Sequence, residues 1–169
     1  YYQHLPHIAL AFGHVLTLGV FPLADMLNWT TYFILSLFPI SIYWSLRRFG
    51  FDDITSAMGG LVASLASTDG LYGFGFGSYV FAGWGLYAQL WGMVLLPPAL
   101  ALSYRTMREG RGYVWATLLL AATLMSHVIY GYMAFLTLGV LTFIQPTSLS
   151  DSKSLAEVMW RKWRRLIVL

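Results

Sequence analysis

The chain has 169 residues, of which 58% are hydrophobic and only 10% are charged, and its formal net charge is +3. Soluble domains carry about 25% charged residues, so this composition excludes an ordinary soluble domain and indicates an integral membrane protein. The lack of cysteine excludes disulfides, thiolate metal sites and thiol nucleophiles, and the small positive charge is a topology signal that predicts no nucleic-acid partner.

All ten basic residues fall into three clusters, which are separated by long stretches almost free of charge. The clusters are Arg47-Arg48, Arg105 to Arg111, and Lys153 to Arg165. Lys and Arg gather on the cytoplasmic side of membrane proteins, and if all three clusters face that side, each stretch between them crosses the bilayer an even number of times. Spans without dyad alternation are helices. We therefore predict an all-α polytopic bundle with about five crossings, some of them short broken helices, and an interfacial helix at each end.

The segment from Leu5 to Val20 precedes the first predicted span. Because that span enters the membrane from the external side, both ends of this segment are expected on the external side. We expect it to lie along the membrane as an amphipathic helix, with Gln3, His7 and His14 on one polar face and His4 close by. Neutral imidazole is a common metal ligand, so the histidines suggest a metal site. The alternative is that they form only the solvated face of the helix.

The stretch from Met26 to Leu46 contains 21 residues without a charge, which is long enough for one crossing. Pro39 is expected to kink this helix. Asp25 stands where an N-cap belongs, and Asp53 is expected to cap the next helix. Asp25 is also a candidate external carboxylate, able to hold a divalent cation or act as a general base.

The next helix, Ile54 to Thr68, is short, and Gly59-Gly60 predicts close contact with a neighbouring helix. Asp69 follows it on the external side, either as an ordinary turn residue or as a second external carboxylate. The Gly- and aromatic-rich segment from Leu71 to Gly85 is expected to be an external or re-entrant loop. With the residues after it, this segment supplies side chains that could stack on a sugar or an isoprenoid, or form an aromatic belt: Tyr72, Trp84, Tyr87, Gln89 and Trp91.

Leu86 to Tyr104 is expected to return to the second basic cluster, carrying Pro97-Pro98 within it. The uncharged run from Val114 to Ile144 has 31 residues, so we predict two short helices that meet at Ser126-His127. An ionisable side chain within an apolar membrane segment is costly, so we expect His127 to have a function. The alternatives are an imidazole that satisfies backbone groups freed at the break, or an axial ligand to haem or chlorophyll.

Leu155 to Leu169 is predicted to be a basic amphipathic helix on the anionic cytoplasmic leaflet, with Arg161, Arg164 and Arg165 opposite its apolar side. We divide the chain into a transmembrane helical domain, residues 1–150, and a cytoplasmic-side helix, residues 151–169, that leads to a further span. The chain is expected to be an internal piece of a longer polytopic protein.

The order of these elements resembles the N-terminal half of GT-C-type membrane glycosyltransferases, over roughly residues 1–145. It is most similar to a prokaryotic branch labelled as membrane proteins related to 6-pyruvoyl-tetrahydropterin synthase. The motifs that carry the resemblance are Tyr1-Tyr2-Gln3-His4-Leu5-Pro6-His7, Leu46-Arg47-Arg48-Phe49-Gly50, Thr55-Ser56-Ala57, Gln89-Leu90-Trp91 with Pro97, and Leu124-Met125-Ser126-His127. Where the related pattern has proline before Leu5-Pro6, this chain has His4.

The resemblance implies an enzyme of a prokaryotic plasma membrane that transfers a sugar from a polyprenyl-phosphate donor on the external side, often with Mg or Mn. The catalytic base is then expected upstream of Tyr1. Substrate contacts are expected from His4, His7, Asp69, Tyr72, Trp84, Gln89 and His127, and His4, His7 and Asp69 are the candidate metal ligands.

The competing hypothesis is a non-catalytic transmembrane subunit of a respiratory or photosynthetic complex. Its partners would be membrane lipids and other membrane subunits, with pigment or haem on His127.

Overall fold

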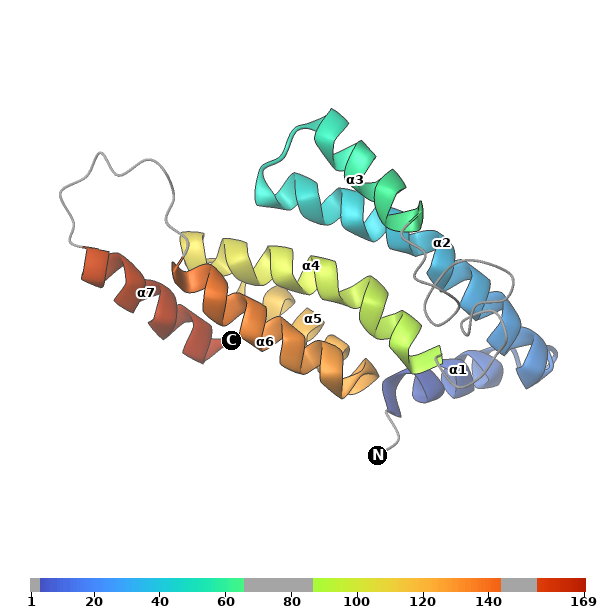
Figure 1. Cartoon of the computed structure of the whole chain (residues 1–169). Helices are drawn as coiled ribbons and strands as arrows, with labels where there is room; N and C mark the ends of the chain where they lie inside the picture. Colours follow the sequence, from blue (N-terminus) through green and yellow to red (C-terminus); the bar gives the residue numbers. More distant parts are fainter. Residues whose placement is uncertain (1–3, 66–86, 144–154) are drawn as a thin grey trace.

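The computed structural model describes residues 4–65, 87–143 and 155–169, and within these ranges the chain forms seven α-helices and no strands (Figure 1). The predicted all-α class is confirmed for this part of the chain. In order the helices are α1 (His4–Leu16), α2 (Leu23–Phe49), α3 (Asp53–Leu65), α4 (Tyr87–Glu109), α5 (Tyr113–Ser126), α6 (Val128–Phe143) and α7 (Leu155–Val168). None of these helices combines the length and the apolar composition that a membrane span requires.

The central helix is α4, which packs mainly against α2 and α5 and also contacts α1, α6 and α7 (Figure 1). The main core cluster is shared by α4, α5 and α6 and contains Ala99, Met107, Leu120, Ala134 and Leu138. A second cluster joins α2 to α4 through Ile34, Leu35 and Leu90. Alanine at core positions lets neighbouring helix backbones approach closely.

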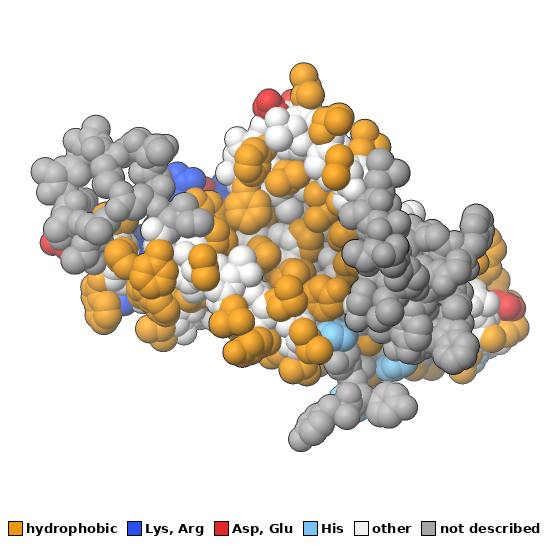
Figure 2. Space-filling model, viewed as in Figure 1, with side chains coloured by type: hydrophobic (Ala, Val, Ile, Leu, Met, Phe, Trp, Pro, Cys, Tyr) orange, Lys and Arg blue, Asp and Glu red, His pale blue; other side chains and the backbone are white. Residues whose placement is uncertain are grey.

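The three basic clusters lie at one end of the bundle. Arg48 and Arg105 line the same cavity there, and Arg165 of α7 donates hydrogen bonds to two backbone carbonyl oxygens in the last turn of α4. Figure 2 shows Lys and Arg side chains toward this end and His side chains away from it, with hydrophobic side chains over much of the face between. A shared end for the basic clusters is the condition from which an even number of crossings between them was predicted.

Both helix ends at the turn between α2 and α3 are capped, the end of α2 by backbone hydrogen bonds and the start of α3 by a side chain. Gly50 has φ +104° and ends α2, with its N–H bonded to the carbonyl of Arg47 and the N–H of Phe51 bonded to that of Leu46. This is the Schellman arrangement, which favours glycine because its φ is positive. Asp52 caps α3, since its Oδ1 accepts a hydrogen bond from the Thr55 N–H at 2.6 Å.

Two capping predictions are wrong by a few residues. Asp53 is the first residue of α3 rather than its cap, and its carboxylate pairs with Arg47 at 2.8 Å. Asp25 lies in the first turn of α2, where Pro22 holds the N-cap position without a side-chain hydrogen bond. A carboxylate in the first turn still favours the helix through the dipole of its N-terminus.

The predicted close contact at Gly59-Gly60 is confirmed. A Cβ on Gly60 would lie 2.8 Å from the carbonyl oxygen of Pro39 in α2, and a Cβ on Gly59 would collide with the side chain of Leu46. The two glycines therefore let α3 pack directly on the backbone of α2. Pro39 lies within α2, which continues unbroken to Phe49.

The amphipathic character of α7 is confirmed, with one correction. Trp163 packs on Phe143 of α6 with ring centroids 6.1 Å apart, Leu166 packs against the main core, and Arg161 and Arg164 are exposed. Arg165 was predicted on the solvated face, but it is partly buried and bonds to α4. A long basic side chain can bury its stem while its guanidinium finds carbonyl acceptors.

Candidate functional site

An apolar cavity of about 430 Å³ lies between α1, α2 and the first turns of α4, at the end of the bundle away from the basic clusters. Among the residues that line it, only three carry polar side-chain atoms, namely Thr30, Tyr87 and Trp91. The lining residues are Ala9, Leu10, Gly13, Met26, Thr30, Phe33, Ile34, Leu37, Tyr87, Trp91, Val94 and Leu95. A concave, mostly apolar cavity with few polar groups is the usual form of a binding site.

The polar atoms of this cavity differ in their hydrogen bonding. The Tyr87 hydroxyl donates to Oγ1 of Thr30 at 3.2 Å, and Thr30 in turn donates to the carbonyl of Met26 at 2.7 Å. The indole Nε1 of Trp91 is buried and has no hydrogen-bond partner in the described part of the chain. Buried polar groups are normally paired, so this N–H is a donor that a ligand can use.

His7 does not line the cavity but lies beside Tyr87, which does. Its ring centroid lies 6.1 Å from that of Tyr87, whose own ring meets Trp91 edge-on at 6.3 Å. The three rings form a continuous path from the exposed surface of α1 into the cavity. His4 is also exposed on α1, whereas Nδ1 of His14 donates to the carbonyl of Phe21 at 2.9 Å and fixes the turn into α2.

His127 forms the predicted break between α5 and α6. Its backbone is extended, with φ −156° and ψ 111°, and its N–H bonds to the carbonyl of Thr123 at 2.9 Å. The side-chain Nδ1 is buried without a partner among the described residues, and so is Oγ of Ser126. Neither Nδ1 of His127 nor Oγ of Ser126 therefore bonds to a backbone group within the described ranges.

Gly92 of α4 accommodates the break. A Cβ on this glycine would lie 2.9 Å from Cβ of His127 and 2.9 Å from the ring of Tyr130. His127 and Tyr130 meet edge-on, with ring centroids 5.1 Å apart. The α5–α6 break thus packs directly on α4, about one turn from Gln89 and about one and a half turns from Tyr87.

The structure brings four of the predicted residues to this end of the bundle: His4, His7, Gln89 and His127. Gln89 is partly buried in the first turn of α4. The predicted residues Asp69, Tyr72 and Trp84 lie outside the described residues. No group of three potential metal ligands occurs within the described ranges.

The sequence did not single out Thr30 or the α1 wall of the cavity, Ala9 to Gly13. Two residues could have indicated the cavity from the sequence: Gly13, which has no side chain, and Thr30, which carries a hydroxyl in a mostly apolar segment. That signal becomes specific only when α1 is known to pack against α2 and α4. A scan against protein-family models and searches of curated proteins and solved structures found no match.

Proposed function

We propose that the chain belongs to an integral membrane GT-C-like glycosyltransferase that uses a polyprenyl-phosphate sugar donor on the face away from the basic clusters. The observation that carries the proposal is the apolar cavity that opens beside the exposed His7. A polyprenyl chain is hydrocarbon, and such a cavity buries it without leaving polar groups unpaired. An imidazole beside the cavity supplies an N–H donor for the phosphate.

A polytopic placement in a membrane is part of this proposal. The shared position of the basic clusters supports it, because they can all face the cytoplasm. With 14 residues, α5 is about 21 Å long, less than the ~30 Å hydrocarbon core, so the break at His127 would lie below the opposite surface. Several large apolar side chains of α5 and α6 are more than 60% exposed, as lipid contact requires: Val114, Trp115, Ile129, Tyr132 and Val140.

The chemical roles follow from this placement. His7, with His4 nearby in sequence, would contact the donor phosphate, and Gln89 and His127 would lie deeper at the same end. The described residues do not fit a divalent metal by themselves, so a Mg or Mn ion would need Asp69 or a carboxylate from another segment.

A second candidate is a non-catalytic transmembrane subunit of a respiratory or photosynthetic complex. It is favoured by Nδ1 of His127, which is buried and has no hydrogen-bond partner among the described residues, because imidazole nitrogen is the usual protein ligand of such groups. A visible absorption spectrum of the purified protein tests it, because a bound pigment or haem absorbs strongly and the apoprotein does not.

Native mass spectrometry with a polyprenyl phosphate tests the donor cavity. We expect saturable binding that Gly13→Phe weakens at least about tenfold, because the new ring occupies the space of the isoprenoid. Gly139→Phe is the matched control, since nothing lies within 4 Å of a Cβ at that position of α6. Equal binding to both variants, or no binding to the unmodified chain, would contradict the proposal.

Transfer of a radiolabelled sugar from a polyprenyl-phosphate donor, assayed in membranes containing the protein, tests the enzymatic part. His7→Ala should lower transfer and polyprenyl-phosphate binding but leave binding of the uncharged polyprenol unchanged. A membrane in which transfer is the same with and without the protein would leave only a lipid-binding role.

A further inference from the structure

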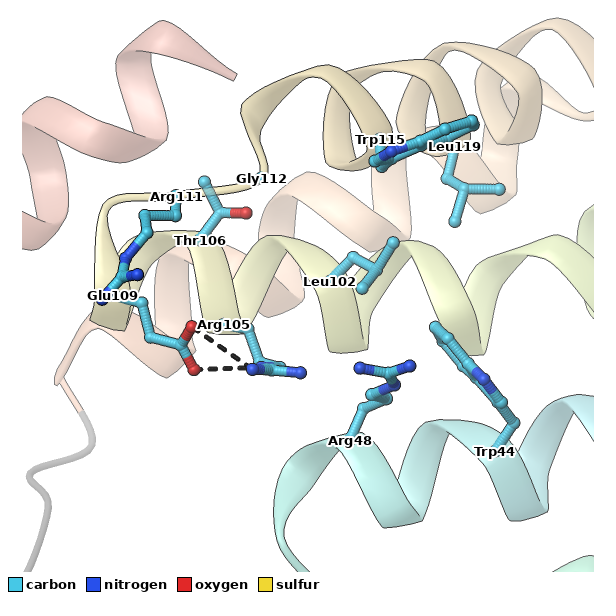
Figure 3. A pocket seen from close by; sticks show the side chains of 10 residues that line it. All are labelled: Trp44, Arg48, Leu102, Arg105, Thr106, Glu109, Arg111, Gly112, Trp115 and Leu119. Carbon is cyan, nitrogen blue, oxygen red and sulfur yellow. Dashed lines mark hydrogen bonds and ion pairs between the residues drawn. The ribbon is translucent and has the colours of Figure 1, made fainter.

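A second cavity, of about 520 Å³, lies at the basic end of the bundle, between the last turns of α2 and α4 and the start of α5 (Figure 3). It differs from the donor cavity because charged side chains line one side of it. Its lining residues are Trp44, Arg48, Leu102, Arg105, Thr106, Glu109, Arg111, Gly112, Trp115 and Leu119. Arginines from two of the three basic clusters therefore meet in one concave site.

One of these arginines is already used within the protein. Nε and Nη2 of Arg105 donate to the two carboxylate oxygens of Glu109 at 3.0 and 3.3 Å. This hydrogen bond, with the charges of Arg105, Arg111 and Arg108, lowers the pKa of Glu109 below its usual value. The carboxylate thus stays ionised and holds Arg105 in place.

The other two arginines keep their charge available. Neither Arg48 nor Arg111 forms an ion pair with a carboxylate in the described part of the chain. With three arginines and one glutamate in its lining, the cavity has an excess of two positive charges. The cavity is therefore complementary to an anion.

Arg48 is held in position by an aromatic ring. Its guanidinium carbon lies 4.8 Å from the ring centroid of Trp44, and Figure 3 shows the side chain extending from α2 toward α4. A cation–π contact of this kind orients a guanidinium while leaving N–H donors at its edge free. Arg48 is thus oriented without being neutralised.

The end of α4 would by itself repel an anion, because the last carbonyls of a helix carry partial negative charge. Arg165 of α7 offsets this effect by donating to the carbonyls of Met107 and Arg108 at 2.9 and 2.7 Å. A Cβ on Gly110 would lie 2.7 Å from Nη2 of Arg165, so glycine makes room for this contact. The third basic cluster therefore supports the cavity without lining it.

The wall beside the arginines is apolar. Trp115 is 68% exposed, and Leu102, Leu119 and Trp44 complete the surface around it. A ligand that satisfies the whole cavity must carry an anionic group next to an apolar group. Tryptophan is favoured where one side of a site is apolar and the other is wet.

We propose that this cavity binds a phosphate ester, with Arg48 contacting the phosphate and with Arg105 and Arg111 adding positive charge around it, and that its apolar wall makes an anionic phospholipid the ligand. The guanidinium fork matches two phosphate oxygens at once, which makes arginine the preferred residue for this contact. Basic pockets between helices at the cytoplasmic surface are a recognised form of headgroup site. The site lies at the opposite end of the bundle from the donor cavity, so each proposal is tested separately.

Native mass spectrometry of the purified full chain in non-ionic detergent tests the site, with phosphatidylglycerol, phosphatidylcholine and glycerol 3-phosphate as probes. We expect phosphatidylglycerol to bind, Arg48→Gln to weaken its binding about tenfold or more, and Arg111→Gln to weaken it less, because Arg111 lies beyond Glu109 from Arg48. Arg48→Lys should give intermediate affinity, because it keeps the charge but loses the fork. Arg161→Gln is the matched control, since it removes the same charge from an exposed position of α7.

The outcomes separate specific binding from general attraction to a basic surface. If Arg161→Gln weakens binding as much as Arg48→Gln does, or if phosphatidylcholine binds as well as phosphatidylglycerol, the proposal is overturned. If glycerol 3-phosphate binds as tightly as the lipid and depends on Arg48, the phosphate site stands and its ligand is a soluble ester. A circular dichroism spectrum identical to that of the unmodified chain shows that each variant is folded.

Discussion

The hydroxyl of Ser41 in α2 donates a hydrogen bond of 2.6 Å to the backbone carbonyl oxygen of Val94 in α4. In an uninterrupted helix this oxygen would accept the N–H of residue 98, but Pro98 has no N–H to give. Ser41 is 8% exposed and Val94 is partly buried, so the bond is partly shielded from water. One side chain thus compensates for a proline on another helix and joins α2 to α4.

We predict that Ser41→Ala lowers the free energy of unfolding by about 1 kcal/mol, because it leaves the partly buried carbonyl of Val94 without this donor. Ser36→Ala is the control, since Ser36 is exposed and its hydroxyl donates only to Phe33 of the same helix. Denaturant unfolding in detergent, followed by circular dichroism, measures both. Equal losses would mean that the bond to Val94 adds nothing.

Pro98→Ala extends the test, because alanine restores an N–H that can bond to Val94 within α4. We expect the loss caused by Ser41→Ala to become smaller in the Pro98→Ala background, by about 1 kcal/mol. A double-mutant cycle on the same unfolding measurements gives this coupling. Additive effects would show that the two residues act independently.

Much of the fold could be predicted from features that are local in sequence. The break at His127 followed from one polar pair in a long uncharged run, whereas a shared end of the basic clusters was the assumption from which the even number of crossings was derived. The capping errors have different physical causes. At α3, Asp52 and Asp53 are adjacent acceptors and backbone geometry decides between them, whereas α2 begins after Pro22, three residues before Asp25.

The sites were less predictable, because both depend on contacts between distant segments. His7 and His127 were expected to be important, but nothing local indicates that Tyr87 continues the path from His7 into a cavity. The basic cavity is lined by Arg48 of α2 together with Arg105 of α4 and Arg111 after it. The sequence suggested only that the basic clusters share one side of the protein. The packing of α2 against α4 is what makes Arg48 and Arg111 line the same cavity.

Gly92→Ala should destabilise the protein by about 1–3 kcal/mol, because its methyl group would be forced against His127 and Tyr130 at the α5–α6 break. Gly139→Ala should instead stabilise it by up to about 1 kcal/mol, since α6 has open space there and alanine is the better helix former. In thermal unfolding, we therefore expect a lower melting temperature for Gly92→Ala and a higher one for Gly139→Ala. A stabilising Gly92→Ala would contradict the close packing of the break on α4.

The cap at Asp52 predicts a pH dependence. Hydrogen bonds from Thr55, together with the charge of Arg47, lower the pKa of Asp52 below its usual value. The ionised form is therefore favoured in the folded state, so its stabilisation is present above about pH 4 and is lost as the pH falls through the lowered pKa.

Asp52→Asn keeps a capping oxygen but cannot titrate, so its melting temperature should fall less than that of the unmodified chain between about pH 5 and pH 2. Comparison of the two proteins isolates Asp52, because Glu109 titrates in the same direction in both. If the melting temperatures of the two proteins fall equally with pH, the charge of the Asp52 carboxylate does not contribute to the stability of the cap.

Arg165→Gln should release α7 from the bundle, since it removes both hydrogen bonds to the end of α4, to Met107 and Arg108. Bonds from a charged donor contribute about 1.5–3 kcal/mol each when buried, and partial exposure reduces this, so we expect amide exchange in α7 to rise about tenfold. Arg164→Gln is the control, because it removes an equal charge from the exposed side of the same helix. Hydrogen exchange measured by mass spectrometry separates the two outcomes: faster exchange confined to α7 in Arg165→Gln supports the anchor. An equal rise in both variants would mean that general charge, and not the contact with α4, holds this helix in place.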